Sequence, residues 1–171
     1  EIRNAARRAI LAGANQYAPG MGLPVLRQAV AEHQERFYGL KLDPGTEIMV
    51  TTGATEGIAA ALLALTGPGD EVLTFEPFYD SYGAMIGLSG ATHTTAPLLA
   101  PDFQPDLDAL EAAFTDRTRV VLVNNPHNPT GAVFPETVLQ RIVDLAVKHD
   151  AVIVTDEVYE HLTFGARHIP V

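Results

Sequence analysis

The stretch from Val120 to Tyr159 constrains the fold of this chain more than any other. It reads VVLVNNPHNPTG, then a helical run, then AVIVTDEVY, so two apolar strands each end in a polar cluster. The carboxyl ends of parallel strands form the ligand edge of an open α/β sheet. Asn128 and Asp156 are 28 residues apart (156 − 128), which leaves room for the helix and strand of a βαβ unit. We therefore expect both clusters to face one crevice.

Strand and helix patterns alternate along the rest of the chain. Apolar residues at helical spacing predict helices over 2–12 and 25–38. Further helices are expected before Gly67, up to Gly90, over 106–114 and over 135–149, with strands over 47–51, 72–75, 91–97, 119–124 and before Asp156, and a surface loop up to Pro105. This alternation predicts an α/β fold, namely a doubly wound, mostly parallel sheet with helices on both faces. Residues 1–40 would form N-terminal helices and a loop, and residues 47–165 the sheet core.

Charge and composition narrow the range of partners. The chain of 171 residues has 21 acidic and 11 basic side chains, and its formal charge of −10 argues against nucleic acid or an anionic membrane surface. The absence of cysteine excludes a disulfide framework and a thiol nucleophile. The longest apolar run, 58–65, falls short of the ~20 residues that a membrane span needs. We expect a soluble, cytoplasmic domain that binds a small molecule.

The expected crevice collects groups that suit a phosphorylated heteroaromatic ring. TTGATEG places a helix start at Gly53 to Thr55, where free N–H groups bind anions, although an ordinary capped turn would look the same. Tyr79 follows a strand and is suited to stack on a flat ring, although aromatic residues at strand ends are also common in cores. A carboxylate at Asp156 would keep a pyridine nitrogen protonated, and its alternative role is a helix cap. Together with the amide of Asn128 and the phenol of Tyr159, these groups point to pyridoxal phosphate.

Four motifs, in this order and spacing, resemble the class I and II aminotransferases, which are fold type I pyridoxal phosphate enzymes. They are GATEG, EPFYDSY, NNPHNPTG and TDEVYEHL. The likeness is closest to the branch that holds kynurenine, glutamine-K, methionine and N-succinyldiaminopimelate aminotransferases, and it covers nearly the whole chain. It implies transfer of an amino group from an amino acid to a 2-oxo acid. It also implies that the chain is a partial large domain without the C-terminal small domain.

The resemblance assigns one group of residues to the phosphate and the ring. The backbone N–H groups of Ala54 and Thr55, with the Thr55 hydroxyl, would hold the phosphate at the turn that begins with Gly53. The ring would stack on Tyr79. Asp156 would pair with the pyridinium nitrogen.

The resemblance assigns a second group to the rim of the cofactor. Asn128 and Tyr159 would donate hydrogen bonds to the phenolic oxygen of the ring, and Asn124 matches a second asparagine near the cofactor. Tyr17 matches a tyrosine that reaches the phosphate of the neighbouring subunit, which would make the active form a homodimer. A surface-loop aromatic is the alternative for Tyr17.

A Schiff-base lysine, which such enzymes use to move the proton between substrate and cofactor, has no match in this chain. The two lysines are Lys41 and Lys148. Lys148 precedes the strand that ends near Asp156, so at ~3.3 Å per residue over about five residues it lies roughly 16 Å from Asp156, at the wrong edge. Lys41 precedes the strand expected at 47–51 and so also lies on the amino side. We therefore assign no catalytic residue, and expect these 171 residues alone not to turn over.

Other functions remain open at this stage. A pyridoxal phosphate-dependent β-lyase would share the same crevice, and a non-catalytic binding remnant would keep the same fold. The six histidines show no metal-ligand spacing, so no metal site is assigned. A serine hydrolase is excluded because no G-x-S-x-G motif occurs.

Overall fold

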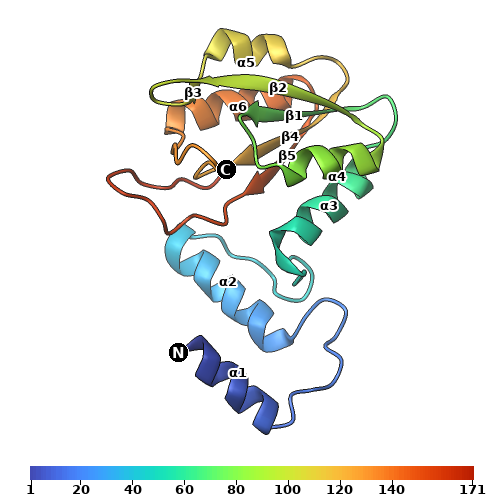
Figure 1. Cartoon of the computed structure of the whole chain (residues 1–171), viewed down its shortest axis with the longest axis vertical. Helices are drawn as coiled ribbons and strands as arrows, with labels where there is room; N and C mark the ends of the chain where they lie inside the picture. The colour runs from blue at the N-terminus through green and yellow to red at the C-terminus, as the bar shows by residue number, and fades with distance from the viewer. The chain divides into compact units, whose positions relative to one another are not determined.

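The computed structural model describes residues 1–171, which divide into two compact units, 1–51 and 52–171 (Figure 1). The first unit contains α1 (Ile2–Leu11) and α2 (Pro24–Tyr38), as the apolar spacing predicts. Pro24 suits the first turn of α2, because N–H groups in the first turn have no intrahelical acceptor and proline has no N–H to leave unpaired. Gly39 ends α2 in the left-handed conformation, with a φ of 72°. None of the helices in the structure has both the length and the apolar character needed to cross a bilayer.

The prediction of a strand over 47–51 is wrong. A strand requires a neighbour with which to exchange backbone hydrogen bonds, and no sheet includes this segment. A turn around Asp43 precedes the segment, because the Asp43 carboxylate accepts hydrogen bonds from the Gly45 N–H at 2.7 Å and from the Thr46 hydroxyl at 2.8 Å. The Val50 N–H then donates to the carbonyl of Met21 at 3.1 Å.

The second unit is built on a five-stranded sheet with the order β3-β2-β1-β4-β5. Strands β1, β2, β4 and β5 are parallel, and only the short edge strand β3 runs antiparallel to its neighbour β2. The expectation of a mostly parallel sheet is confirmed, whereas β3 falls within the stretch expected to be a loop. The elements are α3 (Gly53–Leu65), β1 (Glu71–Glu76), α4 (Ser81–Ser89), β2 (Thr92–Leu99), β3 (Gln104–Pro105), α5 (Leu107–Ala113), β4 (Thr118–Asn124), α6 (Glu136–Lys148) and β5 (Val152–Asp156).

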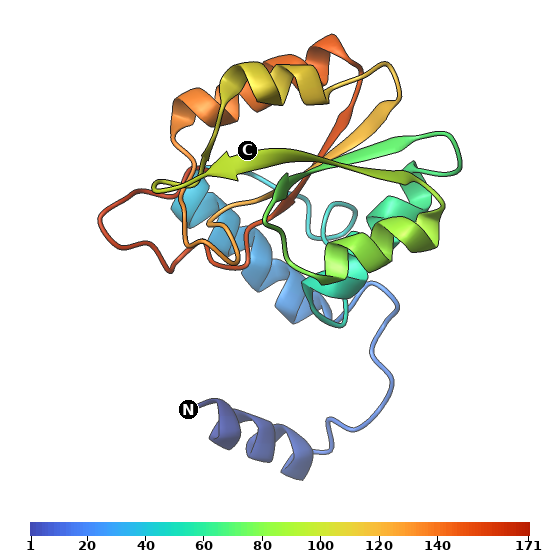
Figure 2. The same ribbon diagram turned by 45° about the horizontal axis from the view of Figure 1, so that its top comes forward.

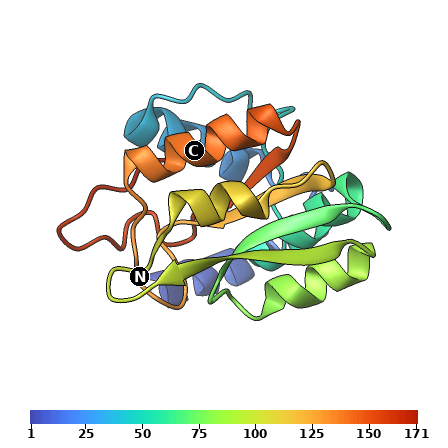
Figure 3. The same ribbon diagram turned by 90° about the horizontal axis from the view of Figure 1, so that it is seen from above.

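Helices cover both faces of this sheet, with α3 and α4 on one face and α5 and α6 on the other (Figures 2 and 3). Strand β4 shows how alternation directs its side chains. Val120 and Leu122 pack with α3 and α4, whereas Val121 and Val123 pack with α5 and α6. Each such buried side chain stabilises the fold by ~1.5–3 kcal/mol relative to its exposed state. The doubly wound architecture is therefore confirmed.

The chain order creates a switch point between β1 and β4. From β1 the chain continues to β2 on one side, and it then returns to the other side of β1 to form β4 and β5. Successive crossover connections consequently leave β1 and β4 in opposite directions, which opens a crevice at their carboxyl ends. This geometry selects where a ligand can bind before any side chain is considered.

Candidate functional site

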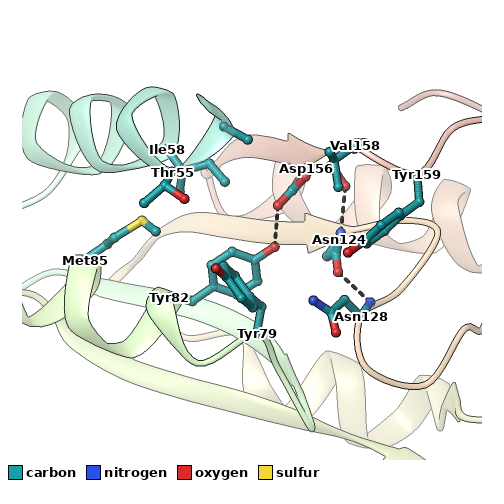
Figure 4. Close-up of a pocket in the computed structure, with 11 residues that line it drawn as sticks. Thr55, Ile58, Tyr79, Tyr82, Met85, Asn124, Asn128, Asp156, Val158 and Tyr159 are labelled. Carbon is teal, nitrogen blue, oxygen red and sulfur yellow. Dashed lines mark hydrogen bonds between the residues drawn. The ribbon is translucent and has the colours of Figure 1, made fainter. Parts of the chain in front are cut away.

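A pocket of about 250 Å³ lies at this carboxyl edge (Figure 4). Asn124 ends β4 and Asp156 ends β5, and the two are paired in the parallel ladder, so their side chains meet at the same edge. Helices α3 and α4 supply the opposite wall. The lining residues are Ala54, Thr55, Ile58, Tyr79, Tyr82, Met85, Asn124, Asn128, Asp156, Val158 and Tyr159.

The carboxylate of Asp156 is the central polar group of the pocket. Asp156 is only 8% exposed, and its Oδ2 accepts a hydrogen bond from the Tyr82 hydroxyl at 2.7 Å. Its Oδ1 accepts from the Val158 N–H at 3.2 Å. No lysine or arginine lines the pocket. A buried carboxylate without a basic partner favours a ligand that brings a positive charge.

Tyr82 is a site residue that sequence reasoning does not assign. Burial raises the pKa of its phenol well above the usual range, and the hydrogen bond to Asp156 and the charge of Asp156 raise it further. The hydroxyl therefore stays protonated and acts as the donor. Its ring meets the Tyr79 ring edge to face, with centroids 5.6 Å apart and planes at 84°. Tyr79 remains 37% exposed, so part of its ring is open to a stacking partner.

The Asn124 side chain connects the ends of β4 and β5 through hydrogen bonds to the backbone. Its Nδ2 donates to the carbonyl of Asp156 at 2.9 Å, and its Oδ1 accepts from the Asn128 N–H at 2.7 Å. The side chain is 3% exposed. By contrast, the carboxamide of Asn128 and the hydroxyl of Tyr159 take part in no hydrogen bond within the chain, and both side chains line the pocket (Figure 4).

The start of α3 forms the other end of the pocket. Gly53 has a φ of 75°, a left-handed conformation that only glycine adopts without steric cost. The Thr52 N–H donates to the Glu56 carboxylate, and this hydrogen bond lowers the pKa of Glu56. The first N–H groups of a helix lack intrahelical acceptors, so those of Ala54 and Thr55 are suited to bind an anion.

The remaining assigned residues lie elsewhere. Gly53 sits at the turn but does not itself line the pocket. Tyr17 belongs to the first unit and its side chain is fully exposed. Neither lysine lines the pocket. The Lys148 Nζ donates a hydrogen bond to the Glu111 carboxylate at 2.9 Å, and the Lys41 Nζ lies 3.8 Å from the Glu35 carboxylate.

Four lining residues have no assigned role in the sequence prediction, namely Ile58, Tyr82, Met85 and Val158. Ile58 and Met85 have the helical spacing of core residues and do belong to the core that covers one face of the sheet. Tyr82 follows Tyr79 by three residues, which is about one helical turn. That spacing was the available signal that both tyrosines approach the same pocket.

Fold and pocket together define a doubly wound α/β protein with a pocket at its switch point. Comparison with known proteins gives the family: residues 1–171 match the model described as aminotransferase class I and II, and the chain belongs to this family. The resemblance drawn from the four motifs is confirmed. The family is known to use pyridoxal 5′-phosphate.

Individual relatives agree with this assignment. A probable N-succinyldiaminopimelate aminotransferase of Mycobacterium tuberculosis is 53% identical over 99% of this chain and 44% of its own length. The methionine aminotransferase of Escherichia coli is 42% identical over 91% of this chain and 40% of its own length. The solved structure of N-succinyldiaminopimelate aminotransferase from M. tuberculosis has a TM-score of 0.95 and 52% identity, over 98% of this chain and 44% of that one.

The chain thus spans less than half the length of these relatives. Their names are those of aminotransferases, which does not favour a β-lyase or a non-catalytic binding remnant.

Proposed function

We propose that the full-length protein is a pyridoxal 5′-phosphate-dependent aminotransferase, which moves an amino group from an amino acid to a 2-oxo acid. The observation that carries this proposal is the buried Asp156 carboxylate, which has no basic partner and shares its pocket with the anion-binding start of α3. When bound, the cofactor supplies a protonated ring that stabilises negative charge at the substrate Cα.

The pocket residues fit this cofactor in their chemistry. The N–H groups of Ala54 and Thr55 would hold its phosphate, and Asp156 would balance the charge of the ring nitrogen. Tyr79 would offer its open ring surface for stacking. The polar groups of Asn128 and Tyr159, which have no partner within the chain, would bind the phenolic oxygen of the ring. Asn124 would act beside them by holding the strand ends in register.

The active form in this proposal is a homodimer in the cytoplasm, in which Tyr17 reaches the phosphate of the neighbouring subunit. The support is the match of NQYAPGMG to the family pattern and the full exposure of the Tyr17 side chain. A phenol without protein contacts is available to a partner. Light scattering of the full-length protein measures this assembly, and a monomer that remains fully active would contradict it.

The decisive experiment compares the full-length protein with its Asp156→Asn variant. The formation of 2-oxo acid is measured with added pyridoxal 5′-phosphate, a 2-oxo acid acceptor and a panel of amino donors that includes N-succinyldiaminopimelate, methionine, aspartate and kynurenine. Asparagine keeps the shape but removes the charge, so we expect kcat to fall by about a hundredfold or more. Circular dichroism and the melting temperature show whether the variant is folded. Near-normal turnover by Asp156→Asn would refute the assigned role.

A further inference from the structure

The hydrogen bond between the Tyr82 hydroxyl and the Asp156 carboxylate joins α4 to the end of β5. The two residues are 74 positions apart, and the hydroxyl–Oδ2 distance is 2.7 Å (Figure 4). Tyr82 is 2% exposed, so its ring is fixed by packing among the side chains of α3, α4 and the sheet. A donor held in this way cannot follow the carboxylate if the carboxylate rotates.

The second oxygen of Asp156 is held from another direction. Its Oδ1 accepts from the Val158 N–H at 3.2 Å, within the turn that follows β5. Two donors on two different oxygens define the plane of the carboxylate. Because each carboxylate oxygen has two acceptor positions, the group can still accept a further hydrogen bond from the pocket.

Tyr82 also touches the residue that would stack on the ring. Tyr79 lies just before α4 and Tyr82 lies in its first turn, and their rings meet edge to face at 5.6 Å. The edge of one ring against the face of the other is a favourable arrangement. Tyr82 therefore links two groups that would contact the cofactor, one at its face and one at its nitrogen.

Building on the proposed function, we propose that Tyr82 is a positioning residue, which orients the Asp156 carboxylate toward the ring nitrogen of the cofactor. Tyr82 does not touch the reacting atoms in this role. It acts through Asp156, and its effect must therefore depend on whether the ligand has a ring nitrogen. A residue with a merely structural role would affect every ligand of the pocket alike.

The test measures dissociation constants by calorimetry on the full-length protein without cofactor. The probes are pyridoxamine 5′-phosphate and its 1-deaza analogue, in which carbon replaces the ring nitrogen. Tyr82→Phe removes only the hydroxyl, so we expect affinity for pyridoxamine 5′-phosphate to fall about tenfold and affinity for the analogue to stay within about twofold. Tyr38→Phe is the matched control, because it removes the same atom from a tyrosine that does not line the pocket. Its preference for the nitrogen-containing ligand should equal that of the wild type.

A double variant checks that the effect passes through Asp156. Asp156→Asn should abolish the preference for the nitrogen-containing ligand, and adding Tyr82→Phe to Asp156→Asn should change neither constant further. Equal loss of both ligands in Tyr82→Phe, by distortion or by failure to fold, would overturn the proposal, and so would an unchanged preference. If the wild type itself shows no preference between the ligands, the proposed function fails instead.

Discussion

Two asparagines four residues apart, Asn124 and Asn128, have the same side chain but differ in what their carboxamides bind. The Asn124 amide is buried and connects the carbonyl of Asp156 to the N–H of Asn128. The Asn128 amide lines the pocket and binds no group of the chain. One motif, NNPHN, therefore contains a residue that builds the site and a residue that is available to a ligand.

This difference predicts opposite effects of the same substitution. Asn124→Ala leaves the Asn128 N–H unpaired and removes one of two hydrogen bonds to the Asp156 carbonyl, which keeps the Asn125 N–H at 3.1 Å, so the free energy of unfolding should fall by about 1–3 kcal/mol. Asn128→Ala should change that free energy by less than about 1 kcal/mol and should weaken the binding of pyridoxamine 5′-phosphate. Urea denaturation and calorimetry separate the two effects. A stable Asn124→Ala variant would show that the bracing role is wrong.

Tyr82 also makes a specific contribution to the pH dependence of stability. Folding raises the pKa of the Tyr82 phenol, mainly through burial and further through Asp156. The contribution of the protonated phenol to the free energy of unfolding is therefore complete below pH ~10, the pKa in the unfolded chain. It is lost as the pH rises above that value. Above that pH the unfolded chain releases a proton that the folded chain keeps. Stability should therefore fall by about 1.4 kcal/mol per pH unit for this group alone. Denaturation of wild type and Tyr82→Phe across this range measures the difference, and equal slopes would contradict it.

At the scale of elements, the start of α3 depends on a left-handed backbone conformation at Gly53. A methyl group added at Gly53 would meet no atom within 4 Å, so only the φ of 75° disfavours it. Gly53→Ala should lower the free energy of unfolding by roughly 1–2 kcal/mol, and should weaken phosphate binding because the N–H groups of Ala54 and Thr55 would be redirected.

Gly87→Ala is the matched control. Gly87 lies inside α4, has no left-handed φ and also leaves open space for a methyl group. Alanine should stabilise the helix there by up to ~1 kcal/mol. Thermal unfolding of both variants therefore tests opposite signs, and equal effects would disprove the importance of the left-handed turn.

Elements with a local signal were predictable, and those that depend on a distant neighbour were not. The continuous apolar run of β4 and the glycine that ends α2 are visible in the sequence and lie where they are expected. The segment 47–51 has the apolar content of a strand but no partner in the sheet. The bond from Tyr82 to Asp156 joins two elements whose approach depends on the whole sheet order. The site prediction therefore included the strand ends, the start of α3 and Tyr79, and assigned no role to Tyr82.

At the scale of the whole molecule, the pocket contains binding groups but no base for proton transfer. A general base must lie within hydrogen-bonding reach of the proton that it moves. Lys148 is engaged by Glu111, and Lys41 pairs with Glu35 within the first unit. The pocket has four titratable groups. Asp156 is bonded to Tyr82 and is assigned to the ring nitrogen, and the raised pKa of Tyr82 keeps that phenol protonated. Tyr79 and Tyr159 are assigned to the face and to the phenolic oxygen of the ring.

We therefore expect a chain of these 171 residues alone to bind pyridoxamine 5′-phosphate but not to transaminate. The measurement is 2-oxo acid formation from an amino donor with pyridoxal 5′-phosphate present, against the slow reaction of the free cofactor and against the Asp156→Asn chain. The rate of 2-oxo acid formation should equal that of the free cofactor. The chain would bind the cofactor and balance its charge, but without a base the proton stays on the substrate Cα. Sustained production above both controls would show that a group within these residues moves the proton, and Tyr159, whose hydroxyl is unbonded in the pocket, would be the first to substitute.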